Sequence, residues 1–256
     1  MSKSKIYNKT FYASMNETHQ RSNLTSAMEI VPYVLNIFPN TKSVIDFGCG
    51  SGTFLSIYKK NGVHEIKGLD GEWVDKDNLL IDNDSFQSIN LEQIKNVKFE
   101  HKYDIAMSLE VAEHIDKRYA DDIVDALTRA SDVIIFGAAI PGQGGAEHVN
   151  EQWQSYWVKK FKDKGYCCFD LLRPEFAVNP MVQHYYAQNT FIYVREKKLL
   201  DYPEIKEMHS YGVLDYALPD TYNLQKERCD TCWEYKELFF RLLQTIKVII
   251  KKMIGK

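Results

Sequence analysis

A glycine-rich turn that follows a short apolar run is the feature that most constrains how this chain can fold. Residues 44–47 are mainly apolar, and a helical pattern begins at Thr53. Gly48, Gly50 and Gly52 occupy alternate positions between them. Glycines lack Cβ atoms, so they permit a tight turn and let a ligand approach the backbone closely. The segment therefore predicts a buried strand, a ligand-binding turn and a helix, in that order.

Seven short runs rich in β-branched and aromatic residues indicate the strands of one sheet. Amphipathic segments alternate with these runs, which is typical of strands and crossover helices in a doubly wound α/β fold with a parallel sheet. The predicted strands are Ser43–Phe47, Glu65–Asp70, Phe86–Leu91, Tyr103–Ser108, Asp132–Gly137, Tyr166–Leu171 and Thr190–Val194.

Three parts of the chain are expected from where this alternation begins and ends. Residues 1–40 form an N-terminal cap segment, with an apolar-periodic helix over Ala27–Phe38. Residues 41–195 form the domain that contains the sheet. Residues 196–256 form a C-terminal extension with one amphipathic helix.

The spacing of the three glycines distinguishes between two kinds of nucleotide-binding turn. A dinucleotide fingerprint needs Gly-x-Gly-x-x-Gly, but the last position counted from Gly48 is Thr53. The run Asp46-Phe47-Gly48-Cys49-Gly50-Ser51-Gly52 instead resembles the first motif of class I S-adenosylmethionine (SAM) dependent methyltransferases. The resemblance implies a seven-stranded Rossmann-like methyltransferase sheet and SAM as the cofactor. It places Asp46, Gly48, Gly50 and Gly52 in the cofactor site.

Polar residues at the ends of the next two strands extend this predicted cofactor site. Asp70, followed by Gly71, ends the second strand, where its carboxylate can accept hydrogen bonds from the ribose hydroxyls. An aspartate after a strand is also a common helix N-cap. Asn90 and Leu91 end the third strand, and similar enzymes often have an acidic residue at the place of Asn90 that contacts the adenine amino group. The asparagine carbonyl can accept the same bond.

The fourth strand runs directly into a segment with the spacing Glu-x-x-Glu-His. On an α-helix Glu110, Glu113 and His114 would share one face, and two carboxylates with an imidazole form a reasonable divalent-metal set. The spacing resembles the metal-binding segment of small-RNA 2′-O-methyltransferases and of ubiquinone O-methyltransferases. Glu110 is also a candidate cofactor contact. Alternatively, the acids lie at a helix start because the helix dipole favours them there.

A glycine-rich polar loop after the fifth strand, residues 138–153, is the second candidate part of the site. Its Gln, Glu, His and Asn side chains supply donors and acceptors for a polar substrate. His148 is the candidate general base, or the fourth ligand of a metal such as magnesium. With Glu113 and His114 it forms the set of candidate catalytic residues. Trp153 and Trp157 either line the acceptor site or pack in the core at helical spacing.

The acceptor is expected to be a small molecule or a glycan. The segment from Ser108 to Trp157 resembles methyltransferases found with enzymes of bacterial capsule, lipopolysaccharide and polysaccharide assembly, which implies O-methylation of a sugar, a nucleotide-sugar or a capsule precursor. RNA 2′-O-methylation, other phosphorylated or amino-bearing acceptors, and a noncatalytic SAM-binding role are the alternatives. The formal net charge of −3, from 32 Lys and Arg against 35 Asp and Glu, disfavours nucleic acid as a partner.

Both ends of the chain and its cysteines bear on the cellular setting. The N-terminus lacks the apolar stretch of a secretory signal, and no window is long and apolar enough to span a membrane, so the protein is expected to be cytoplasmic. The helix predicted over Trp233–Ile254 indicates a docked helix, a homodimer contact or a peripheral membrane contact. Cys229 and Cys232 have a metal-like spacing, but a structural zinc site needs a second such pair.

Overall fold

A seven-stranded sheet forms the centre of the computed structural model, which describes residues 17–207 and 214–229 and the single positions 231, 235, 239 and 242. The strand order is β3-β2-β1-β4-β5-β7-β6. The strands are β1 (Ser43–Phe47), β2 (Glu65–Asp70), β3 (Phe86–Ser88), β4 (Ile105–Leu109), β5 (Val133–Gly137), β6 (Tyr166–Phe169) and β7 (Phe191–Arg195). The predicted fold class is thereby confirmed, and β1 and β2 have the predicted bounds.

Two details of the predicted sheet are wrong. β7 runs antiparallel to both of its neighbours, β5 and β6, so the sheet is mixed and not wholly parallel. β3 ends at Ser88, because Asn90 already caps a short 3-10 helix, η4 (Leu91–Asn96). Every residue of β1, β4 and β5 is buried, as expected for the central strands of a sheet covered on both faces.

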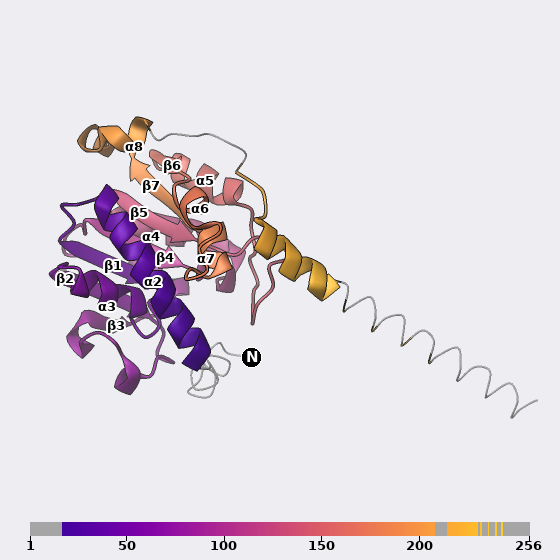
Figure 1. Ribbon diagram of the computed structural model, residues 1–256. Helices are drawn as coiled ribbons and strands as arrows, with labels where there is room; N and C mark the ends of the chain where they lie inside the picture. The colour runs from indigo at the N-terminus through magenta and orange to yellow at the C-terminus, as the bar shows by residue number, and fades with distance from the viewer. Residues whose placement is uncertain are drawn as a thin grey trace, which may run out of the picture. The chain divides into compact units, whose positions relative to one another are not determined.

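Helices cover both faces of the sheet. α2 (Glu17–Ile37) packs against α3 (Thr53–Lys60), the helix that follows the glycine turn, and both cross in front of the strands in Figure 1. α4 (Ala120–Ala130) packs against α5 (Gln154–Lys162) and contributes Ile123, Val124 and Leu127 to a fully buried core. These apolar residues recur at helical spacing, which explains why α4 forms and which side it buries.

α2 is longer than the predicted helix and is tied to the segment before β7. Ser26 is fully buried, and its hydroxyl donates to the Ser22 carbonyl and accepts from the Gln183 amide. Tyr185, on α7 (His184–Asn189), donates its hydroxyl to Asn23. α2 and α7 are therefore fixed to each other beside the carboxyl ends of the central strands.

The chain divides into two compact units between Tyr216 and Ala217, so α2 and residues 196–207 belong to the unit that contains the sheet. In the second unit residues 219–229 are helical. Cys232 and most of Trp233–Ile254 lie outside the described residues, so the predicted docking, homodimer and membrane contacts stay predictions. No helix within the described ranges has the length and apolar character needed to cross a membrane. Cys49, Cys167, Cys168 and Cys229 are free thiols.

Candidate active site

The glycine turn joins β1 to α3 through a left-handed backbone. Gly48, Gly50 and Gly52 have φ angles of 86°, 54° and 81°. A Cβ atom built on Gly50 would meet nothing within 4 Å, whereas one on Gly48 would lie 2.3 Å from the Val111 side chain. The turn therefore needs glycine at Gly48 for packing, and at Gly50 it leaves the backbone open to a ligand.

Two buried aspartates stand at the carboxyl ends of β1 and β2. Asp70 accepts hydrogen bonds from the Gly50 amide at 2.7 Å, the Gly71 amide at 2.6 Å and the Trp73 side chain. Burial raises the pKa of Asp70, although these hydrogen bonds oppose the increase. A carboxylate has about four lone-pair positions, so one remains for a ligand hydroxyl. For Asp46, burial and then the charge of Asp70 raise the pKa well above its usual range.

Asn90 and Leu91 lie where β3 gives way to η4. The Asn90 side-chain carbonyl accepts from the Glu92 amide at 3.0 Å and so serves as the N-cap of η4. Its side chain is exposed, whereas Leu91 is buried and packs with Ile94 in the core. The proposed adenine contact at Asn90 stays a prediction, since the same oxygen now has a second partner.

The Glu-x-x-Glu-His segment is not the α-helix that was predicted. Glu110 follows β4 directly and has a φ of 56°, a left-handed conformation that is strained for a residue with a side chain. Only the short 3-10 helix η5 (Ala112–His114) comes next, and α4 begins at Ala120. The left-handed turn at Glu110 therefore breaks the expected helical face, although the carboxyl groups of Glu110 and Glu113 still interact.

Glu110 forms a closed network with two carboxamides. Its Oε1 accepts from Asn189 Nδ2 at 2.8 Å, and its Oε2 accepts from Gln143 Nε2 at 3.0 Å. Asn189 Nδ2 also donates to Gln143 Oε1 at 2.9 Å. Burial raises the pKa of Glu110 to about 7, against the opposing effect of these hydrogen bonds. This network joins the end of β4, the polar loop and the end of α7.

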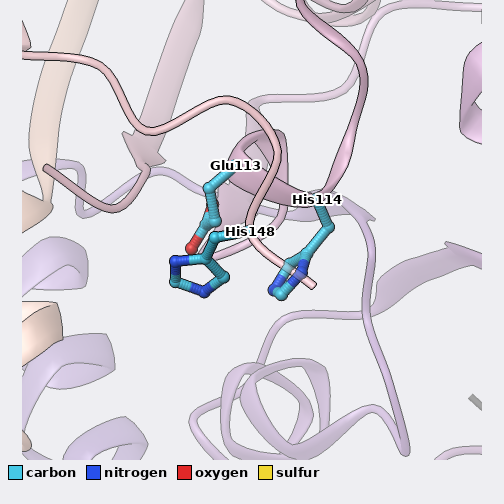
Figure 2. A group of neighbouring side chains, drawn as sticks. All are labelled: Glu113, His114 and His148. Carbon is cyan, nitrogen blue, oxygen red and sulfur yellow. The ribbon is translucent and has the colours of Figure 1, made fainter. Parts of the chain in front are cut away.

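Glu113, His114 and His148 come together in the structure. One potential ligand atom from each lies within 4.8 Å of the others, and the His148 ring stands beside the Glu113 carboxylate (Figure 2). The two imidazole rings meet edge to face with centroids 4.8 Å apart. Glu113 is fully buried, and its carboxylate has only weak hydrogen-bond partners, namely the backbone amides of Glu113 and Ala139 and the carboxyl group of Glu110. Burial, and then the charge of Glu110, raise the pKa of Glu113 well above its usual range.

Backbone contacts hold the polar loop against this cluster. The amides of Val149 and Asn150 both donate to the Glu113 carbonyl, at 2.8 Å and 3.0 Å. The buried Asn150 side chain donates to the Ala112 carbonyl at 3.3 Å. These bonds bring His148, 34 positions along the chain from His114, to the same place as η5.

The aromatic residues after the loop divide between surface and core. Trp157 is buried and lies 5.0 Å from Phe136 between ring centroids, and Phe161 lies 5.3 Å from the same ring. Trp153 precedes α5 and is 37% exposed. The core interpretation is therefore correct for Trp157, whereas Trp153 lies partly at the surface and its contact with an acceptor stays a prediction.

The sequence alone did not assign individual roles to three residues of the site, Gln143, Glu151 and Asn189. Gln143 and Glu151 belong to the polar loop that the sequence singles out; the partners of Gln143 lie in segments that only the fold brings near, and those of Glu151 depend on the conformation of the loop itself. Asn189 lies in a stretch with no glycine or charge pattern of a binding site. The sequence shows only an asparagine before a strand, and its burial becomes visible in the structure alone.

Comparison with known families assigns the chain. The family model for a methyltransferase domain matches residues 18–188, which is more than half of the protein. The chain belongs to this methyltransferase family. Its cofactor is SAM, in agreement with the glycine turn and the buried aspartates described above. No curated protein matches the sequence.

Solved structures share the fold of the methyltransferase at low sequence identity. Magnesium protoporphyrin IX methyltransferase (ChlM) from Synechocystis, with bound SAM, is 15% identical with a TM-score of 0.53 over 77% of this chain and 98% of its own. The sugar N-methyltransferase KedS8 from Streptoalloteichus is 11% identical, with a TM-score of 0.55 over 72% of this chain and 92% of its own. DesVI from Streptomyces venezuelae is 12% identical, with a TM-score of 0.51 over 76% of this chain and 99% of its own.

The described residues fit SAM. The open space at Gly50 leaves room for the cofactor beside the backbone, and a free lone pair on Asp70 suits a ribose hydroxyl. A sulfonium is positively charged, and the buried carboxyl groups of Asp46 and Asp70 and the half-buried carboxyl group of Glu110 lie along this edge of the sheet. The individual contacts to SAM remain predictions.

Proposed function

We propose that this methyltransferase methylates a hydroxyl oxygen of a sugar, a nucleotide-sugar or another capsule or surface-glycan precursor. When bound, SAM supplies an electrophilic methyl group. The observation that supports an oxygen acceptor best is the position of His148 in the polar loop next to Glu113 and His114. An alcohol must lose a proton as it is methylated, and an imidazole can accept that proton near neutral pH.

The chain's own residues supply alignment and proton transfer. Asp70 and the turn at Gly50 hold the cofactor, and the loop presents the acceptor from the opposite side. The acceptor oxygen forms its bond to the methyl carbon as the methyl–sulfur bond breaks, and His148 takes the hydroxyl proton. Holding the two reacting atoms in line is the main contribution that a protein makes to such a displacement.

A divalent metal ion fits the same cluster, which offers one carboxylate and two imidazoles as ligands. Glu113, His114 and His148 would hold it, and the fully buried, weakly hydrogen-bonded carboxylate of Glu113 supports this assignment because such a group is costly without a cation. A bound divalent ion would lower the pKa of an acceptor hydroxyl. Glu110, the fourth predicted ligand, lies outside the three-residue group and is held by Gln143 and Asn189.

The charge of the polar loop supports an acceptor that is uncharged close to its reacting atom. Residues 138–153 contain Glu147 and Glu151 but no Lys or Arg. A site that recognised phosphate close to the reacting atom would be expected to supply cationic side chains. The sugar N-methyltransferase with this fold acts on a sugar, which is consistent with a polyhydroxyl acceptor but leaves the acceptor atom to be tested.

The first test measures binding at the donor site and then identifies the acceptor. Chelator-treated protein is titrated with S-adenosylhomocysteine in a calorimeter and then screened against neutral sugars, nucleotide-sugars, amino sugars and short RNA, with and without magnesium. We expect one-site binding and methylation of a sugar hydroxyl. His148→Ala should lower turnover about 100-fold or more while binding of S-adenosylhomocysteine stays unchanged. Methylation of RNA or of an amine alone would refute the proposed acceptor.

A further inference from the structure

We propose that Glu151 is a positioning residue that fixes the proton on Nδ1 of His148 and holds the polar loop in its working shape. The role rests on the proposed function, because it concerns the residue assigned there as the base. Glu151 itself is placed beside the histidine and the loop backbone, so it acts through them.

One carboxylate receives three hydrogen bonds from the loop. Glu151 Oε2 accepts from the Gly142 amide at 2.7 Å, and Oε1 accepts from the Gly144 amide at 2.8 Å. Oε1 also lies 2.8 Å from His148 Nδ1. The side chains of Glu151 and His148 are 19% and 11% exposed, so water competes little for these bonds.

The charge state of Glu151 determines the direction of the bond to His148. Both oxygens of Glu151 already accept from backbone amides, those of Gly142 and Gly144, which can only donate, and this arrangement favours the ionised carboxylate. An ionised carboxylate only accepts hydrogen bonds. His148 Nδ1 must therefore carry its proton, which leaves the lone pair of the neutral ring on Nε2.

The loop backbone leaves space for the ring in this orientation. A Cβ atom built on Gly145 would lie 2.2 Å from His148 Nε2, so the absence of a side chain at Gly145 makes room for the ring. Gly142 and Gly144 both have left-handed φ angles, 82° and 66°, and both present their amides to Glu151. Glu151 thus selects the loop conformation and the ring tautomer together.

Two substitutions at Glu151 distinguish the loss of its charge from the loss of all three hydrogen bonds, and a substitution at Glu147 serves as control. Glu151→Gln keeps the size of the side chain but offers only one oxygen to three donors, and Glu151→Ala removes all three bonds. Glu147→Gln is the matched control, since Glu147 is an exposed glutamate of the same loop with a left-handed φ of 60°. None of these changes touches the glycine turn that binds the cofactor.

The direct readout needs no acceptor. Nitrogen-15 spectra of uniformly labelled, chelator-treated protein with S-adenosylhomocysteine report the tautomer of each histidine, and His148→Ala assigns the signal of His148. At a pH where the ring is neutral, we expect Nδ1–H in the wild type and in Glu147→Gln. Glu151→Ala should shift the ring toward Nε2–H, and Glu151→Gln should give a mixture. A wild-type Nε2–H ring, or an unchanged ring in Glu151→Ala, would overturn the proposal.

A kinetic readout distinguishes positioning from general loss of structure. With an accepted substrate, Glu151→Ala should lower kcat by about 10- to 100-fold, part of what a general base contributes, with affinity for S-adenosylhomocysteine unchanged. Glu151→Gln should recover part of that loss. Equal kcat in Glu151→Ala and the wild type would contradict the proposal. If the tautomer result holds but no hydroxyl is methylated, the proposed acceptor fails and the role of Glu151 in fixing the ring stands.

Discussion

At the scale of single residues, the cofactor and acceptor sides of the site depend on different kinds of unusual residue. The cofactor side uses glycines, whose left-handed backbone costs little. The acceptor side uses residues with side chains in conformations or environments that do cost energy, such as the left-handed Glu110 and the fully buried, weakly hydrogen-bonded Glu113. Costs of this kind concentrate where a protein binds or reacts with a ligand.

Replacing Gly50 by alanine tests the cofactor turn. The new Cβ would project into the open space at the turn, where SAM is expected, so we expect affinity for S-adenosylhomocysteine to fall by about tenfold or more, or about 1.4 kcal/mol. The left-handed φ should also reduce the unfolding free energy by about 1–2 kcal/mol. Calorimetry and thermal unfolding measure the two effects.

Gly165→Ala is the matched control for that change. Gly165 also has a left-handed φ, 78°, and open space around its added Cβ, but it lies in the turn before β6. It should show the same loss of stability with unchanged affinity. Equal affinity losses in both variants would mean that backbone strain, and not contact with the cofactor, explains the effect at Gly50.

At the scale of elements, the polar loop between β5 and α5 acts as a separately anchored unit. Its middle is attached to η5 through Val149 and Asn150, and Gln143 joins it to α7 through Asn189. None of these anchoring hydrogen bonds involves the turn from β1 to α3. The hydrogen bonds that anchor the loop are therefore distinct from the turn that is expected to bind the cofactor.

Asn150→Ala tests this anchoring. The change leaves the Ala112 carbonyl and the Gln152 amide without their side-chain partner, so we expect a stability loss of about 1–3 kcal/mol. Amide hydrogen exchange should rise across residues 140–150, and turnover should fall while cofactor affinity is unchanged. Val149→Ala, an exposed neighbour that keeps its backbone bond to Glu113, should leave exchange and turnover close to wild type. Slow exchange in Asn150→Ala would show that the loop is held elsewhere.

At the scale of the whole molecule, the buried acids link the stability of the unit up to Tyr216 to pH. Glu110, Glu113 and Asp46 all have raised pKa values because burial disfavours their charged forms. The folded protein without ligands therefore holds protons that the unfolded chain has already released. A bound cation at the edge of the sheet would offset this cost.

The pH dependence of unfolding tests this link through Glu110. Its pKa is raised from 4.5 to about 7, so between those values the folded state keeps a proton that the unfolded state has lost. The contribution of Glu110 to stability is complete below this window and is lost as pH rises through it, with a slope of at most about 1.4 kcal/mol per pH unit. Urea unfolding of chelator-treated protein measures it.

Glu110→Gln removes the proton that this prediction concerns. The variant should lose less stability than wild type as pH rises from 4.5 to about 7, even if Gln143 and Asn189 pair less well and lower its stability at every pH. Parallel curves for the two proteins would contradict the raised pKa of Glu110. The comparison uses slopes, so a constant difference in stability does not affect it.

The sequence by itself determined the sheet, the glycine turn and the two candidate segments, because these depend on local pattern: apolar runs, glycine spacing and the polar composition of residues 138–153. It also predicted that Glu113, His114 and His148 would meet, although for the wrong local reason, since Glu110 breaks the expected helix with a left-handed turn. Tertiary structure alone decided the antiparallel β7, the ring of bonds among Glu110, Gln143 and Asn189, and the placement of Glu151 on His148. These features join segments that are far apart in the chain or depend on loop conformation, and neither leaves a periodic signal in the sequence.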